Sequence, residues 1–370
     1  MQYCVFSIDK IQQYPMSKIT FNNKQSPFFD SLKEKVEVYF KENNIRQTGN
    51  YRLFTKSFVL IPLAIFFYVT LVFFNPGVIL SIVFCILFGF TISSIGFNIM
   101  HDGAHGSYSK YKWINRVMAH SLSLVGGSPF MWRIKHNIIH HSFTNIDGVD
   151  DDLNNRPFFR MTIQDPKYKM HKYQHYYWIV LYMLSYPSWV FMQDFNKYFT
   201  GKIAAYKIRK MTFNDHLKFW TSKVFYIATF IVFPMFFVGV LPTIVGYIVL
   251  AFSCGLGISV VFQLAHIVGK AEFPNPNEDT NKIEEEWAVH QMKTTVNFAT
   301  KSKLVSWLVG GLNFQVEHHL FPKISHVHYP QINKIVKETC SQFKVPYHEY
   351  PTMLSAIKAH VLHLKQMGVA

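Results

Sequence analysis

Residues 57–100 read SFVLIPLAIFFYVTLVFFNPGVILSIVFCILFGFTISSIGFNIM, and this stretch decides the fold. Its 44 residues include no Lys, Arg, Asp, Glu or His. A helix needs about 20 apolar residues to cross a bilayer, and Asn75-Pro76-Gly77 is a turn sequence near the middle of the stretch. The sequence therefore predicts two membrane-spanning helices joined by a tight turn.

A second uncharged stretch, residues 224–265, repeats this pattern over 42 residues. Its turn is expected between Gly239 and Pro242. Two hairpins make four spans, so we predict an all-α integral membrane protein. Because both turns are short, the three polar regions must lie on the same side of the bilayer, where we expect them to form a helical cap. These regions are residues 1–56, 101–223 and 266–370.

The composition agrees with a membrane protein and excludes a disordered chain. Of the 370 residues 49% are hydrophobic and 16% are charged, whereas about a quarter of the residues of a soluble domain are charged. Aromatic residues make up 17% of the chain, and so many large apolar rings need an apolar environment.

The formal net charge of +15 predicts that the polar side of the molecule is cytoplasmic. Between Lys197 and Lys223 there are seven Lys and Arg residues against the single Asp215, and loops of this kind stay on the cytoplasmic side. Docking of an acidic redox partner or of an anionic headgroup is an alternative reason for the basic excess.

The N-terminal sequence and the cysteines add two negative expectations. The first twenty residues contain Asp9, Lys10 and Lys18 and no apolar signal-peptide core, so we expect both termini to be cytoplasmic. The four cysteines lie far apart, which favours neither a disulfide framework nor a zinc ribbon. They are Cys4, Cys85, Cys254 and Cys340.

The expected organisation is one domain with short flanking segments. Residues 1–50 form an N-terminal arm, residues 51–350 the domain with its hairpins and cap, and residues 351–370 a C-terminal tail. Within the cap, the aromatic-rich stretches 113–132 and 176–195 are too polar to span and are expected to lie in the membrane interface.

Histidines gather at the predicted ends of the spans. The chain has 18 histidines, so a single His-x-x-x-His pair is uninformative. HDGAH at 101–105 directly follows the second span, HNIIHH at 136–141 adds a third histidine, and QVEHHLFP at 315–322 contains an adjacent pair. The pair His171/His175 has no further ligand nearby, and we interpret it as unrelated to the site.

Eight histidines are therefore candidate metal ligands. Residues i and i+4 of a helix share one face, so two imidazoles can reach the same ion or neighbouring ions. Adjacent residues of a helix point about 100° apart, so the second histidine of an HH pair addresses a different ion. Eight ligands suit two ions better than one. The eight are His101, His105, His136, His140, His141, His266, His318 and His319.

The ligand type leaves the metal open. Imidazole suits zinc, copper, iron and nickel. No cysteine lies near these histidines, which excludes an iron-sulfur cluster, and no Glu-x-x-His pair indicates a ferritin-like site. HDGAH is superficially similar to the HExxH helix of zinc proteases, but Asp102 is one carbon shorter than the required Glu.

These motifs resemble the three histidine boxes of the membrane-bound fatty acid desaturases. The resemblance includes SFTNIDGVDDD at 142–152, after the second box, and the full third motif, QVEHHLFPKISHVHYP at 315–330. The resemblance covers about residues 50 to 350. A third box that opens with Gln315 is similar to the front-end acyl desaturases, which act between an existing double bond and the carboxyl end. VFQLAHIV at 261–268 and WAVHQMKTTVNF at 287–298 are similar to the same subfamily.

The resemblance implies a reaction and a set of ligands. It implies two irons held by the eight histidines and Gln315, and O2-dependent removal of two hydrogens from a fatty acyl chain on a lipid, coenzyme A or acyl-carrier protein. Polar residues beside the boxes would orient the imidazoles; for the acidic run 150–152 a solvated loop is an equal alternative. These candidates are Asp102, Asn137, Asn145, Asp150, Asp152 and Glu317.

The same resemblance suggests partners and a route for the substrate. No HPGG haem motif occurs in these residues, so the electrons are expected from a separate cytochrome b5 or ferredoxin with its reductase. An apolar channel should lead the acyl chain from the membrane to the metals. Gly255, Gly257 and Ser259 could line it, although small residues in a span more often allow close helix packing.

Two other functions fit part of the pattern. A related di-iron hydroxylase or ketolase uses similar boxes, but the QVEHHLFP box disfavours it. A divalent metal transporter could be rich in histidine, yet transport needs ionisable groups at mid-membrane depth, and both uncharged stretches lack them.

Overall fold

The computed structural model of the protein describes residues 19–23, 26–74, 76–152 and 155–370. Residues 1–18 therefore lie outside the described residues, and with them Cys4 and almost all of the N-terminal stretch that lacks a signal-peptide core. Asn75 of the first predicted turn lies outside them as well. The described chain is mostly helical. Its strands are two residues long and form three pairs: β1 (Thr20–Phe21) with β4 (Lys282–Ile283), β2 (Lys202–Ile203) with β3 (Tyr206–Lys207), and β5 (Asn297–Phe298) with β6 (Glu349–Tyr350).

Four described helical stretches are long and apolar enough to cross a membrane, which confirms the predicted number. They run from Tyr51 to Phe74, from Val78 to His105, from Phe213 to Val238 and from Val240 to His266. Each contains more residues than the uncharged core used to predict it, because the helices continue into polar sequence. Their elements are α3 (Tyr51–Val69) with η1 (Thr70–Phe74), α4 (Val78–Ile95) with η2 (Gly96–Met100) and α5 (His101–His105), α11 (Phe213–Ile227) with η6 (Ala228–Val232) and α12 (Phe233–Val238), and α13 (Val240–His266).

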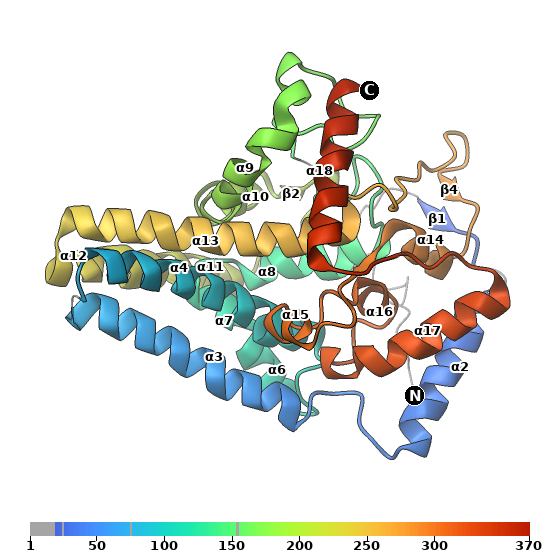
Figure 1. Ribbon diagram of the computed structural model, residues 1–370, viewed down its shortest axis with the longest axis horizontal. Coiled ribbons are helices and arrows are strands. Elements are labelled where there is room, and N and C mark those ends of the chain that lie inside the picture. The colour runs from blue at the N-terminus through green and yellow to red at the C-terminus, as the bar shows by residue number, and fades with distance from the viewer. Residues whose placement is uncertain (1–18, 24–25, 75, 153–154) are drawn as a thin grey trace.

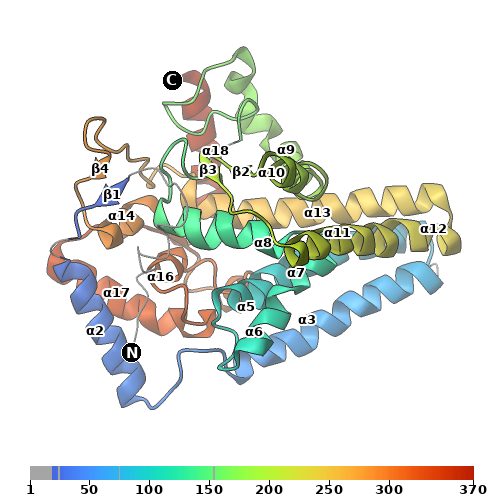
Figure 2. The same cartoon turned by 180° about the vertical axis from the view of Figure 1, so that it is seen from behind.

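The helix ends follow local chemistry. The side chain of Asn50 accepts a hydrogen bond from the Arg52 amide and begins α3. Gly77 and Gly239 precede α4 and α13 with φ of +87°, a conformation that favours glycine. Gly239 alone separates α12 from α13, so the second turn is shorter than expected. The connection between α3 and α4 and that between α12 and α13 lie at the same end of the molecule (Figures 1 and 2).

The helices pack closely around α13, which contacts α4 and also α9 (Gln174–Ser188). A Cβ atom at Gly255 would collide with the carbonyl oxygens of Tyr182 and Met183 on α9. One at Gly257 would collide with Ser93 on α4, and the hydroxyl of Ser259 donates to Ser185 Oγ at 2.7 Å. The three small residues proposed as channel lining therefore serve helix packing.

The remaining helices gather at the opposite end from the two connections (Figure 1). Residues 113–132 and 176–195, expected in the interface, lie mainly in α6 to α8 and in α9 with η5. The bounds are α2 (Pro27–Glu42), α6 (Lys112–Ala119), α7 (Ser121–Leu124), α8 (Pro129–Trp132), η3 (Arg133–His140), η4 (Lys169–Tyr173), η5 (Trp189–Gln193), α10 (Asp194–Thr200), α14 (Trp287–Thr294), α15 (Lys303–Leu308), α16 (Gln315–Leu320), η7 (His326–His328), α17 (Tyr329–Phe343) and α18 (Met353–Val369).

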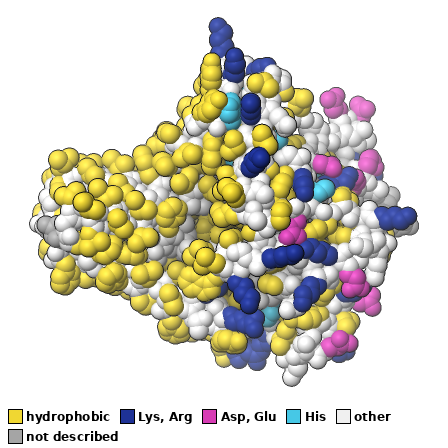
Figure 3. All heavy atoms as spheres, viewed as in Figure 1, with side chains coloured by type: hydrophobic (Ala, Val, Ile, Leu, Met, Phe, Trp, Pro, Cys, Tyr) yellow, Lys and Arg dark blue, Asp and Glu magenta, His cyan; other side chains and the backbone are white. Residues whose placement is uncertain are grey.

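The surface of the molecule also has an apolar end and a polar end. Figure 3 shows hydrophobic side chains covering the end formed by the long helices, and Lys, Arg, Asp and Glu gathered on the other. Ile79 and Phe236 are each 82% exposed on the apolar end. Soluble proteins rarely expose such a large contiguous apolar surface, so this end is suited to lipid.

A buried ion pair ties α11 to the neighbouring helices. Lys223 Nζ lies 2.9 Å from Asp194 Oδ2 and donates to the carbonyl oxygens of Gly126 and Val190. Asp194 also accepts the backbone amide of Ser128. Every hydrogen-bonding group of the pair thus has a partner inside the protein, as burial of two charges requires.

We expect Lys223→Met to lower the free energy of unfolding by about 3–5 kcal/mol, because it leaves the Asp194 carboxylate buried without a cation. Thermal unfolding of the detergent-solubilised protein, followed by tryptophan fluorescence, measures the change. Lys218→Met is the control, since Lys218 is exposed on the same helix. Equal losses of unfolding free energy in the two variants would show that the Lys223–Asp194 pair contributes no more to stability than an exposed lysine does.

Candidate metal centre

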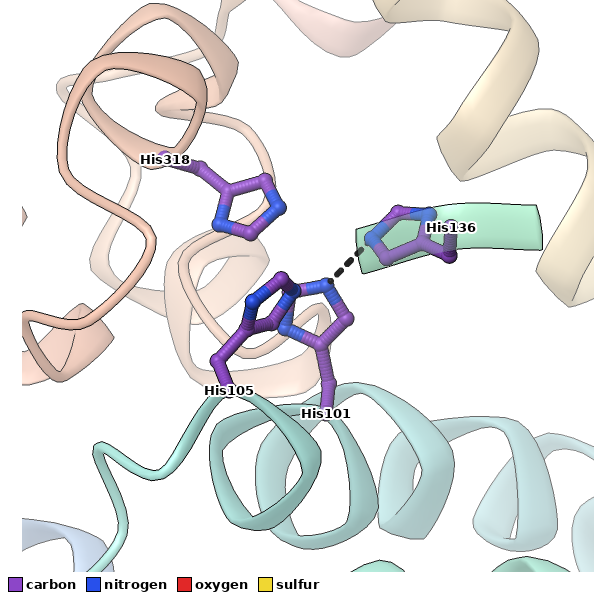
Figure 4. A group of neighbouring side chains, drawn as sticks. All are labelled: His101, His105, His136 and His318. Atoms are coloured by element: carbon purple, nitrogen blue, oxygen red, sulfur yellow. Dashed lines mark hydrogen bonds between the residues drawn. The ribbon is translucent and has the colours of Figure 1, made fainter. Parts of the chain in front are cut away.

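Four histidines from three separate segments form a first group. His101 and His105 lie one turn apart on α5, His136 lies on η3, and His318 lies on α16 (Figure 4). One ring nitrogen of each lies within 4.8 Å of the corresponding nitrogens of the others. His101 Nε2 and His136 Nε2 are 3.2 Å apart, and all four residues are buried. The arrangement can hold a metal ion.

A second group contains His140, His266 and His319, whose ring nitrogens also lie within 4.8 Å of one another. His266 is the last residue of α13, at the end of the span as predicted. The amide of Gln315 faces this group, with Nε2 3.1 Å from His266 Nε2 and 3.4 Å from His319 Nε2. The two amide ends can exchange places by a rotation, so Gln315 can present its oxygen in the same space.

His141 lies between the two groups. Its Nε2 is 3.3 Å from His136 Nε2, and its ring centre is 4.5 Å from that of His319. The reason is the backbone of residues 133–140, which form a π-helix. A π-helical turn brings residues i and i+5 into register, so His136 and His141 share a face that an α-helix would not give them. The structure therefore brings all eight predicted histidines together.

The unpaired ring nitrogens fit a metal site. Nε2 of His105, of His140 and of His318 and Nδ1 of His141 are buried and have no hydrogen-bond partner. A buried polar atom without a partner is unfavourable by about 1–3 kcal/mol, and several together at one place need an explanation. Coordination to metal ions would satisfy the three Nε2 atoms, so the residues present fit the predicted pair of ions.

The electrostatics keep most of these imidazoles neutral, which is the form that binds metal. Burial, reinforced by the neighbouring imidazoles, holds the pKa of His136, of His318 and of His319 well below the usual 6.5. Burial acts in the same direction on His140, but the adjacent Asp150 carboxylate raises the pKa of His140 above its usual value.

In four of the histidines, Nδ1 points away from the group and lies beside a hydrogen-bond acceptor. His140 Nδ1 donates to Asp150 Oδ2 at 2.9 Å, and His319 Nδ1 donates to Gln291 Oε1 at 2.8 Å. These contacts turn Nε2 toward the interior of the group, as is usual for metal-binding histidines. The other two acceptors are the Tyr329 hydroxyl, 3.2 Å from His318 Nδ1, and the Thr294 carbonyl, 3.3 Å from His266 Nδ1.

Sequence reasoning gave no role to four residues beside these histidines: Gln291, Thr294, Tyr329 and Thr144. Gln291 and Thr294 lie in WAVHQMKTTVNF, which showed a family resemblance but suggested no role. Thr144 Oγ donates to the His140 carbonyl and lies 3.2 Å from His319 Nδ1. No spacing signal marks these residues, since their partners are more than a hundred positions away or on another element.

The acidic run is a structured part of the site rather than a solvated loop. Asp150 is buried and binds His140. Asp152 lies 2.5 Å from Lys135 Nζ and 3.7 Å from His140 Nδ1, and Asp151 lies 2.7 Å from Lys197 Nζ. All three carboxylates of the run are therefore paired.

The other four polar candidates contact no imidazole of the two groups. Asn137 Nδ2 donates to the Ala104 carbonyl, and Asn145 Nδ2 donates to the carbonyl oxygens of His266, Glu272 and Thr294. These two amides fix the backbone that carries the histidines.

Glu317 and Asp102 also hydrogen-bond to residues outside the two histidine groups. The Glu317 carboxylate accepts hydrogen bonds from Asn297 and Asn333, and burial raises the pKa of Glu317 to about 7. Asp102 accepts from Ser325 Oγ at 2.6 Å and lies 3.1 Å from His326 Nδ1. Because Asp102 is engaged there, it does not take the position of the base in a zinc protease.

His171 lies apart from the centre. It is buried in η4, where its Nε2 donates to the Pro157 carbonyl at 2.7 Å and its Nδ1 accepts from the Tyr168 amide. Both ring nitrogens are therefore used locally, and His171 belongs to none of the described groups of potential ligands.

Comparison with known proteins adds the family. The family model described as fatty acid desaturase matches residues 76–351. An acyl-lipid (8-3)-desaturase of Physcomitrium patens is 36% identical over 100% of this chain and 78% of its own length. An sn-1 linoleoyl-lipid 6-desaturase of Arthrospira platensis is 36% identical over 95% of both chains. One of the same description from Synechocystis is 32% identical over 95% of this chain and 98% of its own.

We expect His140→Ala and His319→Ala each to abolish activity and to lower the metal content, because each removes an Nε2 from the second group. Membrane insertion should persist, since both residues lie outside the spans. His171→Ala is the control and should keep its metal and most of its activity. Metal analysis of the purified proteins measures the effect, and similar losses at His171 and His319 would mean that the ligand set is wrong.

We expect Gln291→Leu to weaken metal binding by about 10- to 100-fold, because His319 loses the acceptor that orients its ring. Gln291→Glu keeps an acceptor oxygen of the same length and should bind metal nearly as well as the parent. Competition with a chelator of known affinity gives both values. Equal affinities for the Leu variant and the parent protein would exclude an orienting role.

Proposed function

Because the chain belongs to the fatty acid desaturase family and is a fatty acyl desaturase, we propose that it is an O2-dependent di-iron enzyme of the front-end type, which inserts a cis double bond between an existing double bond and the carboxyl end. The observation that carries the di-iron assignment is the convergence of eight buried imidazoles, seven of them in two groups and His141 between the groups. Three of the eight lie at the polar ends of two apolar helices. Gln315 at the start of the third box supports the front-end type.

We assign one iron to each histidine group. The first group would be held by His101 and its three neighbours, and the second by His140, His266 and His319 with Gln315. His141 lies within reach of both groups. Irons bound there would supply the oxidising power, drawn from O2, that removal of hydrogen from an unactivated methylene requires.

The protein's own part in the reaction is to position and to shield. The Nδ1 contacts with Asp150, Gln291 and Tyr329 hold the imidazoles in one tautomer and one orientation. Burial of all eight histidines keeps bulk water away from the reacting carbon atoms. A fixed geometry of this kind limits the reaction to one pair of methylenes in a bound chain.

We propose that the four apolar helices cross the membrane as two hairpins, with the histidine-bearing end and both termini in the cytoplasm. The two short connections at the apolar end and the excess of Lys and Arg in the rest of the chain support this topology. The desaturase domain would then comprise residues 51–350, with residues 1–50 and 351–370 flanking it.

The substrate and the electron donor are part of the same proposal. The relatives named above act on acyl lipids, so we propose that the acyl chain of a membrane lipid is the substrate. Two electrons per double bond must come from outside the reaction site. No HPGG motif occurs in the 370 residues, and we propose cytochrome b5 or a ferredoxin, with its reductase, as the donor.

Expression in a host that supplies a suitable electron donor tests the proposed function. We expect a new fatty acid whose added double bond lies on the carboxyl side of an existing one, located by mass spectrometry of derivatised lipids. The His319→Ala variant, expressed to the same level, should give no such product. An oxygenated product without a new double bond would instead indicate a hydroxylase or ketolase, and metal uptake with an unchanged lipid profile would indicate a transporter.

A further inference from the structure

Lys56 is a buried cation at the start of the first apolar helix. It lies on α3, and only 6% of its surface is exposed, whereas Arg52 one turn earlier is exposed. Its ammonium group points into the protein, under the ring of Trp307 at 6.0 Å. A charge in such a place is unfavourable unless it has specific partners, so its presence points to a role.

The partners of Lys56 come from two other segments. Its Nζ donates to Asn98 Oδ1 at 2.8 Å, on the helical turn just before the first histidine box. It also lies 2.9 Å from His326 Nε2, on η7 in the last part of the third box. Asn98 in turn donates to the carbonyl oxygens of Ser94 and Leu308. Lys56 therefore joins three stretches that are far apart in the chain.

The contacts of His326 extend this connection to the first box itself. Because Nε2 of His326 faces the Lys56 ammonium as an acceptor, the ring proton is on Nδ1. Nδ1 lies 3.1 Å from Asp102 Oδ1, a close electrostatic contact whose geometry is not that of a hydrogen bond, and the other carboxylate oxygen of Asp102 accepts from Ser325 Oγ. One cation, one neutral imidazole and one carboxylate thus form a chain with no net charge. Asp102 stands between His101 and His105 on the same helix.

Hydrogen bonds near Lys56 connect the same three segments. The Gly49 amide donates to the Ser107 carbonyl at 2.8 Å, just after the first box. The Ser325 amide, in the last part of the third box, donates to the Gln47 carbonyl at 2.9 Å. Ser57 Oγ lies 2.8 Å from the Tyr108 hydroxyl. The segment 47–57 is therefore held between the two boxes and contacts both.

We propose that Lys56 is a positioning residue of the metal centre, which acts through His326 and Asp102 to hold α5 against η7 in the last part of the third box. This inference rests on the proposed function, since it concerns the ion of the first group. That group takes His101 and His105 from α5 and His318 from α16, so its geometry depends on the contacts that hold these two helices together. The second group is held by other contacts, those of Asp150, Gln291 and Thr294.

The metal content of the full-length protein, purified in detergent and selected for monodispersity, tests this role. We expect about two irons per chain in the parent protein and about half of that content in Lys56→Met, because only the first group loses its spacing. Lys223→Met is the matched control: it removes the other buried lysine of a span-forming helix, which contacts no histidine box. It should lose stability but keep the parent's iron content per folded chain.

A second pair of variants keeps the test informative if Lys56→Met does not fold. His326→Gln can accept from Lys56 and keeps a polar amide beside Asp102, so we expect the parent's iron content. His326→Leu can do neither and should lose iron as Lys56→Met does. Full iron content in Lys56→Met or in His326→Leu would overturn the inference, as would an equal loss in Lys223→Met. A parent protein without stoichiometric metal would refute the proposed function itself.

Discussion

Burial of eight imidazoles in one place is the constraint on which the rest of this structure depends. An imidazole binds metal in its neutral form, and each of its buried nitrogens needs a partner. Around the second box and in the third, acceptors such as Asp150, Gln291 and Tyr329 satisfy Nδ1, and this leaves Nε2 to face the interior. The cap can be understood as the set of segments that bring these acceptors to the histidines.

The apolar helices contribute more than attachment to lipid. The second span continues without a break into α5, and the fourth ends at His266, so three of the proposed ligands are placed by rigid helices that begin in the apolar end of the molecule. Close packing of α13 on α4 and on α9 then fixes the distance between these ligands. Small residues such as Gly255 and Gly257 have this role.

Charged residues inside the protein are used to join segments. Lys223 with Asp194 and Lys56 with His326 and Asp102 each connect a span-forming helix to the polar end. Near the histidines, Asp102, Asp150, Asp152 and Glu317 each contact a polar or cationic partner in the protein. Imidazole and amide groups then dominate the ligand set.

The sequence by itself determined the four apolar helices, the eight histidines and their resemblance to desaturase boxes, because hydrophobic length and side-chain chemistry are local properties of the chain. Only the tertiary structure decided that residues 133–140 form a π-helix, that Gln291 and Tyr329 orient imidazoles, that the acidic run is paired, and that Lys56 points inward. These features depend on hydrogen bonds and burial between segments distant in the chain, and no local pattern of residues encodes such pairing.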